Sequence, residues 1–271
     1  MSLTLGSGPF GEHPAGEFSP PLRPDPPILY FEDNPRRIRV TFGGETIADS
    51  RRMKLLHESG RLPVYYFPPG DVRQDLLEAS RRTESSPSKG TARFWTVRAH
   101  DRLAADAAWS WDEPLLQGHL AFAWDAMDEW FAEDDQLFGH ARDPYKRIDV
   151  HPSTRHVRVL RDGELLADTR RSRMLFETGL PTRYYIPAED VRTELLVQSP
   201  TKTRCAYKGS ASHWSVRIVD SVISDLVWSY AEPQHDAEAV RDLLCFYQER
   251  VDLELDGEPQ ARPQTQWSRD D

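Results

Sequence analysis

Cysteine is scarce in this sequence of 271 residues, in which only Cys205 and Cys245 occur. Two cysteines cannot build a disulfide framework or a four-cysteine zinc site, and their small number suits a reducing compartment. The internal repeat described below matches Cys205 with Ser86 and Cys245 with Ala121, so the two copies share no thiol. We therefore interpret both cysteines as buried structural residues.

Long hydrophobic runs are also missing. No stretch approaches the eighteen or more apolar residues of a membrane span, and residues 1–27 lack a basic start followed by an apolar core. Basic residues are in deficit, since 34 Lys and Arg face 44 Asp and Glu for a net charge of −10. This balance disfavours nucleic acid and anionic lipid as partners. We expect a cytoplasmic protein whose partners are small molecules or proteins, with no nucleic acid and no membrane.

Catalytic signatures are lacking as well. The sequence has no P-loop, no His-Glu-x-x-His and no Gly-x-Ser-x-Gly motif, and its nine histidines show no metal-ligand spacing. Residues 6–11 match a dinucleotide fingerprint by letters, but proline interrupts them, no strand precedes them and no helix follows. We predict no cofactor and no metal, and the sequence leaves open whether the protein is an enzyme.

An internal repeat dominates what is present. A shift of 119 residues aligns residues 37–114 with 156–233 without a gap, and 32 of 78 positions are identical. After five inserted residues the match resumes between residues 122–128 and 246–252. The period is too long for a solenoid, whose units span about 20 to 50 residues, so the copies are domains.

The repeat predicts a tandem organisation, and the length of the chain permits two separate cores. The expected parts are a flexible N-terminal arm (1–34), a first repeat domain (35–128), an acidic-aromatic bridge (129–154), a second repeat domain (155–257) and a flexible C-terminal tail (258–271). The bridge contains Trp130, Phe131, Phe138 and Tyr145, which suggests a segment packed against a domain face.

The local pattern predicts a mainly β fold with short helices. Alternating residues flank a turn at residues 43–44, and at 162–163 in the second copy, which indicates a hairpin. Residues 51–60 and their mates 170–179 are expected to form a helical turn that ends at a glycine.

Further along each copy, the sequence predicts extended residues 65–67 and 184–186, followed by a short helix that begins at Asp71 or Asp190. Later segments alternate again and carry aromatic and β-branched residues, which is typical of strands.

Several aromatic and charged residues recur in both copies and are candidates for a binding site. The tryptophans could simply fill the cores, or they could line an aromatic pocket with a glutamate as its negative rim. The lysine, which precedes a glycine, could hold a phosphate or carboxylate of the ligand. The structural alternative for the lysine is an ion pair with a neighbouring carboxylate. The candidate ligand-binding residues are Tyr66, Lys89, Trp95, Trp109 and Glu113, and their mates Tyr185, Lys208, Trp214, Trp228 and Glu232.

A second basic spot has a similar sequence in the two copies, Asp-Ser-Arg-Arg at residues 49–52 and Asp-Thr-Arg-Arg at 168–171. Arginine pairs can hold an anion, but structural pairing with Asp49 or Asp168 is the favoured interpretation. Asp71 and Asp190 could act as a general base only if burial raised their pKa, so the helix-start role is preferred.

These paired motifs resemble a known family. "ADSRR/ADTRR", "YYFP/YYIP" followed by "DVR", "KG" followed by "A" and "W", and "WS" followed by "EP" are similar to the uncharacterised bacterial family called domain of unknown function 427. The resemblance covers residues 36–128 and 155–254. It implies a compact β-rich fold similar to the zinc-binding β-tent or Mss4-like domains, without the paired Cys-x-x-Cys motifs that hold their metal.

The naming of that family also suggests a nucleotidyltransferase-like activity. Such enzymes need a carboxylate pair to hold magnesium under the triphosphate. The only suitable triplet, residues 252–254, is not reproduced at residues 128–130, so the residues do not support the label.

Three functional interpretations remain open. The first is a module that binds a nucleotide-like or zwitterionic metabolite in its aromatic pockets. The second is an enzyme on such a ligand, in which Lys89 or Lys208 stabilises negative charge and Glu113 or Glu232 moves protons. The third is a scaffold that docks a protein partner through residues 129–147.

Overall fold

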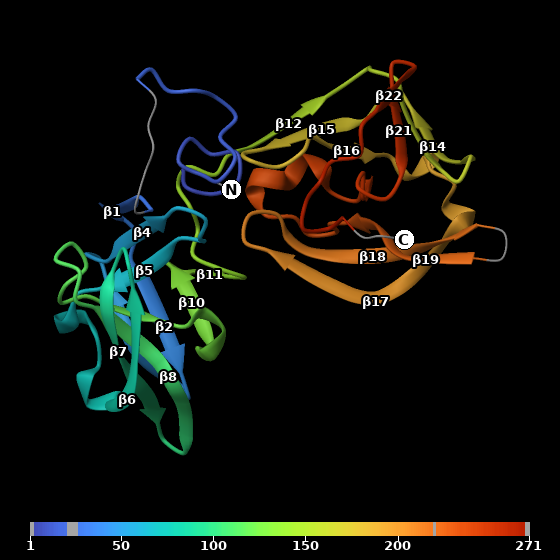
Figure 1. Ribbon diagram of the computed structural model, residues 1–271. Helices are drawn as coiled ribbons and strands as arrows, with labels where there is room; N and C mark the ends of the chain where they lie inside the picture. Colours follow the sequence, from blue (N-terminus) through green and yellow to red (C-terminus); the bar gives the residue numbers. More distant parts are fainter. Residues whose placement is uncertain (1–2, 21–26, 219–220, 269–271) are drawn as a thin grey trace. The chain divides into compact units, whose positions relative to one another are not determined.

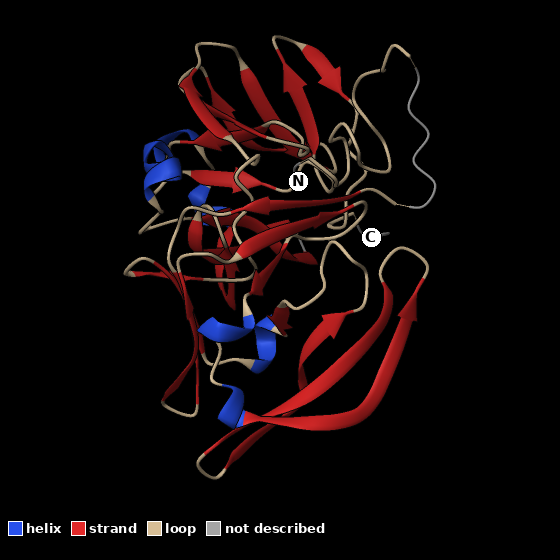
Figure 2. Ribbon diagram, turned by 90° about the vertical axis from the view of Figure 1, so that its left-hand side faces the viewer, coloured by secondary structure: helices blue, strands red, loops and turns tan. Residues whose placement is uncertain are grey.

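The structure, a computed structural model, describes residues 3–20, 27–218 and 221–268 and divides into two compact units, Met1–Tyr145 and Lys146–Asp271 (Figure 1). Each unit consists of a seven-stranded and a four-stranded antiparallel sheet. Strands dominate, and the helices are short 3-10 segments (Figure 2). The expected mainly β fold with two similar domains in tandem is confirmed, as a pair of two-sheet sandwiches. No helix in the described ranges is long and apolar enough to cross a membrane.

The first unit contains eleven of the strands. Its seven-stranded sheet has the order β1-β4-β5-β9-β8-β7-β6, with β1 (Leu29–Asp33), β4 (Lys54–Glu58), β5 (Val64–Phe67), β6 (Leu77–Ser86), β7 (Gly90–Ala99), β8 (Arg102–Trp111) and β9 (Leu120–Phe122). Its four-stranded sheet has the order β11-β10-β2-β3, with β2 (Ile38–Phe42), β3 (Glu45–Ser50), β10 (Glu129–Ala132) and β11 (Asp135–Leu137). Its 3-10 helices are η1 (Pro69–Asp71), η2 (Gln74–Leu76) and η3 (Trp124–Ala126).

The second unit repeats this topology. Its seven-stranded sheet has the order β12-β15-β16-β20-β19-β18-β17, with β12 (Ile148–Pro152), β15 (Arg173–Glu177), β16 (Arg183–Ile186), β17 (Leu196–Cys205), β18 (Gly209–Ile218), β19 (Ser221–Ser229) and β20 (Leu244–Phe246). Its four-stranded sheet has the order β14-β13-β21-β22, with β13 (Val157–Arg161), β14 (Glu164–Thr169), β21 (Asp252–Leu255) and β22 (Glu258–Gln260). Its 3-10 helices are η4 (Ala188–Asp190), η5 (Thr193–Leu195) and η6 (His235–Val240).

Each unit encloses its own core between its two sheets. In the second unit, Val157 and Leu253 of the small sheet pack with Val216 and Val227 of the large sheet. Successive side chains of a strand point to opposite faces, so each large sheet has an inner face toward this core and an outer face. The outer face carries a second, smaller cluster in each unit. Among the described residues, no apolar cluster contains residues of both units, as two separate cores require.

The predicted hairpins and extended segments are confirmed. β2 pairs with β3, and β13 with β14. Gly43 and Gly44 have φ of 60° and 80°, and Asp162 and Gly163 have φ of 53° and 81°. Two successive residues with positive φ make the tight turn that matches strand twist. Residues 65–67 and 184–186 lie in β5 and β16.

The helical turn predicted in residues 51–60 and 170–179 is wrong. These segments contain the strands β4 and β15, which lie between two partners in the sheet. Pairing on both sides outweighs a weak helical pattern in a run this short. Gly60 and Gly179 do adopt a positive φ, but they lie in the turn after the strand.

The helix expected to begin at Asp71 and Asp190 is also absent as such. In each unit two 3-10 segments of three residues lie there, and the aspartate ends the first of them without a capping hydrogen bond. Asp71 instead accepts hydrogen bonds from Ser50 and Arg52, both at 2.7 Å. The aspartate therefore ties the turn to the neighbouring strand.

The N-terminal arm, the bridge and the C-terminal tail all contain strands. The arm ends in β1, which pairs with β4, and the bridge contributes β10, β11 and β12. The tail contributes β22. Trp130 of the bridge is buried in the first core, where its ring stacks on Trp124 at 4.5 Å. β1, β11, β12 and β22 are edge strands, so each of these segments extends a sheet of its own unit by one strand at its edge.

Candidate functional site

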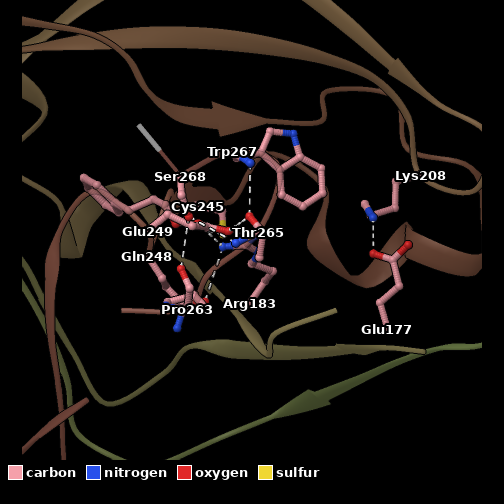
Figure 3. Close-up of polar contacts among 11 residues, drawn as sticks. Glu177, Arg183, Lys208, Cys245, Gln248, Glu249, Pro263, Thr265, Trp267 and Ser268 are labelled. Carbon is pink, nitrogen blue, oxygen red and sulfur yellow. Dashed lines mark hydrogen bonds and ion pairs between the residues drawn. The ribbon is translucent and has the colours of Figure 1, made fainter. Parts of the chain in front are cut away.

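A buried lysine-glutamate ion pair lies at the same place in both units. Lys89 Nζ is 2.5 Å from Glu58 Oε2, and Lys208 pairs with Glu177 in the same way (Figure 3). Lys89 lies 4.9 Å from the centre of the Trp111 ring. The carboxylate that meets each lysine is therefore not Glu113 or Glu232. The structural alternative for the lysine, an ion pair with a neighbour, is present.

A third charged group joins the pair in the second unit. Lys146 Nζ is 2.8 Å from Glu177 Oε1, and its side chain is 8% exposed. Burial disfavours the charged form of Glu177, but Lys208 and Lys146 outweigh it and lower the pKa of the carboxyl to about 2. Glu177 is therefore a firmly ionised anchor, unsuited to moving protons near neutral pH.

Tyrosine and tryptophan lie together on the outer face. Trp109 donates a hydrogen bond to the Tyr66 hydroxyl at 3.4 Å, and Trp228 donates one to Tyr185 at 3.2 Å. Tyr66 and Tyr185 are 1% and 0% exposed. Burial raises the pKa of both phenols, so they stay neutral. Trp228 is buried as well, whereas Trp109 is half-buried.

The candidate residues thus divide between two faces of the large sheet. Trp95 and Trp214 are half-buried and pack against the core on the inner face. Glu113 lies in the turn after β8, where it accepts a 3.5 Å hydrogen bond from the backbone of Leu115. Glu232 is exposed. The ten residues do not form one pocket per domain.

Trp214 lines a groove of about 550 Å³ in the second unit. The groove runs from η4 and η5 across β17, β18 and β19 to β20. Its lining residues are Ala188, Thr193, Leu196, Gln198, Ser212, Trp214, Ser229, Ala231, Asp242 and Leu244. This volume is in the range of small-molecule sites, about 300 to 1,000 Å³.

Strand register explains which side chains meet in the groove. Gln198 lies opposite Trp214, and Ser212 lies between Lys202 and Ser229. Residues directly opposite each other on one face have Cβ atoms about 5 Å apart. Lys202 Nζ donates to Ser212 Oγ at 2.5 Å, which places a cation at the groove edge. The groove therefore combines an indole face, hydroxyl and amide groups, and one cation.

The first unit has a different set at the same positions. Trp95 corresponds to Trp214, but Ala79 replaces Gln198, Arg93 replaces Ser212 and Thr83 replaces Lys202. The indole and one serine, Ser229 with its mate Ser110, are thus shared, whereas Gln198, Ser212 and Lys202 are not.

A second buried ion pair lies on the outer face of the second unit. Arg183 holds Glu249 through two hydrogen bonds of 2.8 and 2.7 Å, and the side chains are 7% and 0% exposed. Burial opposes ionisation of Glu249, but hydrogen bonds from Arg183 and Thr265 prevail and lower the pKa of its carboxyl. Figure 3 shows these groups close to Trp267, near the Lys208–Glu177 pair.

The second basic spot forms ion pairs, though not with the expected partner. Arg52 pairs with Asp71 and Arg171 with Asp190, each at 2.7 Å, whereas Asp49 pairs with Arg37. Arg52 and Arg171 outweigh the effect of burial and lower the pKa of Asp71 and Asp190. A general-base role for either aspartate therefore has no support here.

Sequence reasoning missed several of the charged residues. Glu58 and Glu177 carried a usable signal, because they are an identical acidic pair in a run whose other positions mostly differ. Arg183 and Glu249 carried none, since Val64 and Asp125 replace them in the first copy.

Fold and repeat define a tandem of two similar β-sandwich domains. A family model described as a domain of unknown function (DUF427) matches residues 30–133 and 149–257. The chain therefore belongs to this family and contains its domain twice. No curated protein matches the sequence significantly.

Proposed function

We propose that the second domain binds a small, nucleotide-like or zwitterionic molecule in the groove that contains Trp214. The observation that carries the proposal is the combination of a half-buried indole with hydrogen-bonding side chains in a groove of about 550 Å³. A planar ring stacks on an exposed indole face, and such stacking contributes about 1–3 kcal/mol in nucleic-acid complexes.

The polar residues favour a ligand with charge at its ends. Lys202 and Ser212 suit a phosphate or carboxylate, because lysine is a compact cation and the hydroxyl adds a donor. Asp242, exposed at the end of the groove, suits an amine. The Gln198 amide can both donate and accept hydrogen bonds, and so suits the polar edge of a ligand ring.

The test is a thermal-shift screen of nucleoside monophosphates and amino-acid derivatives on the full chain. A ligand at one hundred times its Kd stabilises by about 2.7 kcal/mol. We expect Trp214→Ala to weaken binding of a stabilising compound about tenfold, and Trp95→Ala, the matched change in the first domain, to leave it intact.

Because Trp214 also packs against the core, the exposed Lys202 provides a gentler variant. Lys202→Met should weaken the binding of anionic compounds and leave the Tm of the free protein nearly unchanged. If the stabilising compounds stabilise the Trp214→Ala and Lys202→Met variants as much as the wild type, the groove is not the binding site.

Nucleotidyl transfer is not part of this proposal. The carboxylates of residues 252–254 are both in ion pairs, Asp252 with Arg262 at 2.8 Å and Glu254 with Arg158 at 2.5 Å. Such pairing neutralises the groups that would hold magnesium.

A further inference from the structure

The C-terminal loop, residues 263–268, lies over the Arg183–Glu249 pair. Thr265 Oγ1 donates a 2.6 Å hydrogen bond to Glu249 Oε1. The Arg183 guanidinium lies 5.5 Å from the ring centre of Trp228 and 5.5 Å from that of Trp267. The arginine is thus flanked by an indole of the sheet and an indole of the loop.

This arrangement belongs to the second domain alone. The first domain keeps the indole at Trp109, but Val64 and Asp125 stand where Arg183 and Glu249 would be. A buried ion pair costs several kcal/mol per ion in desolvation and is often no more stable than an apolar replacement. The packing of the sheet therefore does not require the pair, since the related sheet does without the arginine.

The loop is held to the domain by few polar contacts. Four of its hydrogen bonds join residues within the loop: Thr265 N to Ser268 Oγ at 3.1 Å, Trp267 N to Thr265 Oγ1 at 3.1 Å, Ser268 N to Thr265 O at 3.1 Å, and Ser268 Oγ to Pro263 O at 3.3 Å. In the described part of the chain, Thr265 to Glu249 is the hydrogen bond from this loop to the rest of the domain. A segment with so few links can open at modest cost.

From these contacts we propose that the Arg183–Glu249 pair is a second ligand site, specific for a molecule with an aromatic ring and an alkyl amine. We propose also that the C-terminal loop occupies this site in the free protein. The loop supplies what such a ligand would supply: a flat ring beside Arg183, from Trp267, and a hydrogen-bond donor for Glu249, from Thr265. The donor must be neutral or cationic, because Arg183 already makes two hydrogen bonds to the carboxylate.

The test uses two matched probes, tryptamine and indole-3-propionate, which share the ring and differ in the sign of the charged group. Each is titrated calorimetrically into the full chain and into the double variant Thr265→Ala/Trp267→Ala. Tryptamine should bind the double variant about tenfold more tightly, as expected where the loop covers the site about nine tenths of the time. Indole-3-propionate should bind at least tenfold more weakly than tryptamine.

One readout separates this site from the groove. The indole N–H resonance of Trp228 should move on titration of the double variant with tryptamine. Equal tryptamine affinity with and without the loop substitutions would overturn the proposal. So would the absence of tryptamine binding to the double variant, or equal affinity for both probes.

Discussion

Glu177 is the residue on which the second unit's buried charges converge, because Lys146 and Lys208 both contact its carboxylate. Glu58 holds the same position in the first unit with Lys89. Repetition of a buried pair in both domains favours a structural role. It fixes the turn before β7 to β4, and the turn before β18 to β15, although these strands are not neighbours in the sheet. We therefore interpret Lys89 and Lys208 as residues that stabilise the fold.

Replacement of this carboxylate should destabilise the protein strongly. Glu177→Gln leaves two buried ammonium groups without a counter-charge, and breaking a buried pair costs about 3–5 kcal/mol. Glu194→Gln is the matched control, since its pair with Arg192 is exposed and such pairs contribute little to stability. Urea unfolding measures both, and similar losses would refute the assignment.

The same residue predicts a pH dependence. The pKa of Glu177 is lowered from 4.5 to about 2 in the folded protein, so its stabilisation is complete above about pH 5 and is lost as pH falls from 4.5 toward 2. A shift of this size corresponds to about 3 kcal/mol. The free-energy difference between wild type and Glu177→Gln should shrink over that interval, whereas a constant difference would show that the carboxylate is not held ionised.

At the scale of elements, the turn that joins β6 to β7 requires its glycine. Gly90 has φ of 73°, and a Cβ there would lie 1.9 Å from Asp112 Oδ1. That oxygen accepts a hydrogen bond from the backbone of Thr91 at 2.5 Å. The lysine-glycine motif shared by both copies is thus a turn with a buried lysine beside it.

Gly90→Ala should therefore lower the free energy of unfolding by about 1–3 kcal/mol, from the left-handed conformation and the displaced carboxylate. Gly70→Ala serves as a control, because no atom lies within 4 Å of the Cβ position. Chemical denaturation of the two variants compares them directly. A loss no greater for Gly90→Ala than for Gly70→Ala would argue against this account of the motif.

The sequence predicted elements well where period and turn chemistry agree, as at the hairpin of β2 and β3. It failed at β4 and η1, where short segments take their form from neighbouring strands rather than from their own pattern. For the site, repetition identified Lys89, Tyr66 and Trp109, but it could not tell the two faces of the sheet apart. Nor could it find Arg183, which the first copy lacks.

At the scale of the whole molecule, duplication has given two domains with separate cores and unequal surfaces. The shared positions include the buried Tyr66 and Lys89 and their mates, whereas residues around Trp214 and Arg183 differ between the domains. We therefore propose that binding occurs in the second domain.

Separate cores predict that residues 1–145 and 146–271, produced individually, each fold. Each should show β-sheet circular dichroism and a cooperative thermal transition, because the apolar clusters of one unit contain no residue of the other. Fragments that remain unfolded until they are mixed would contradict this division.

Binding in the second-domain groove can be followed through the indole N–H signals of the eight tryptophans in a two-dimensional NMR spectrum. The full chain is titrated with the strongest stabiliser from the nucleotide and amino-acid panel. The account predicts that the Trp214 signal, assigned by its loss in Trp214→Ala, shifts and saturates while that of Trp95 stays in place. A titration that shifts other indole signals and leaves Trp214 unmoved would contradict it.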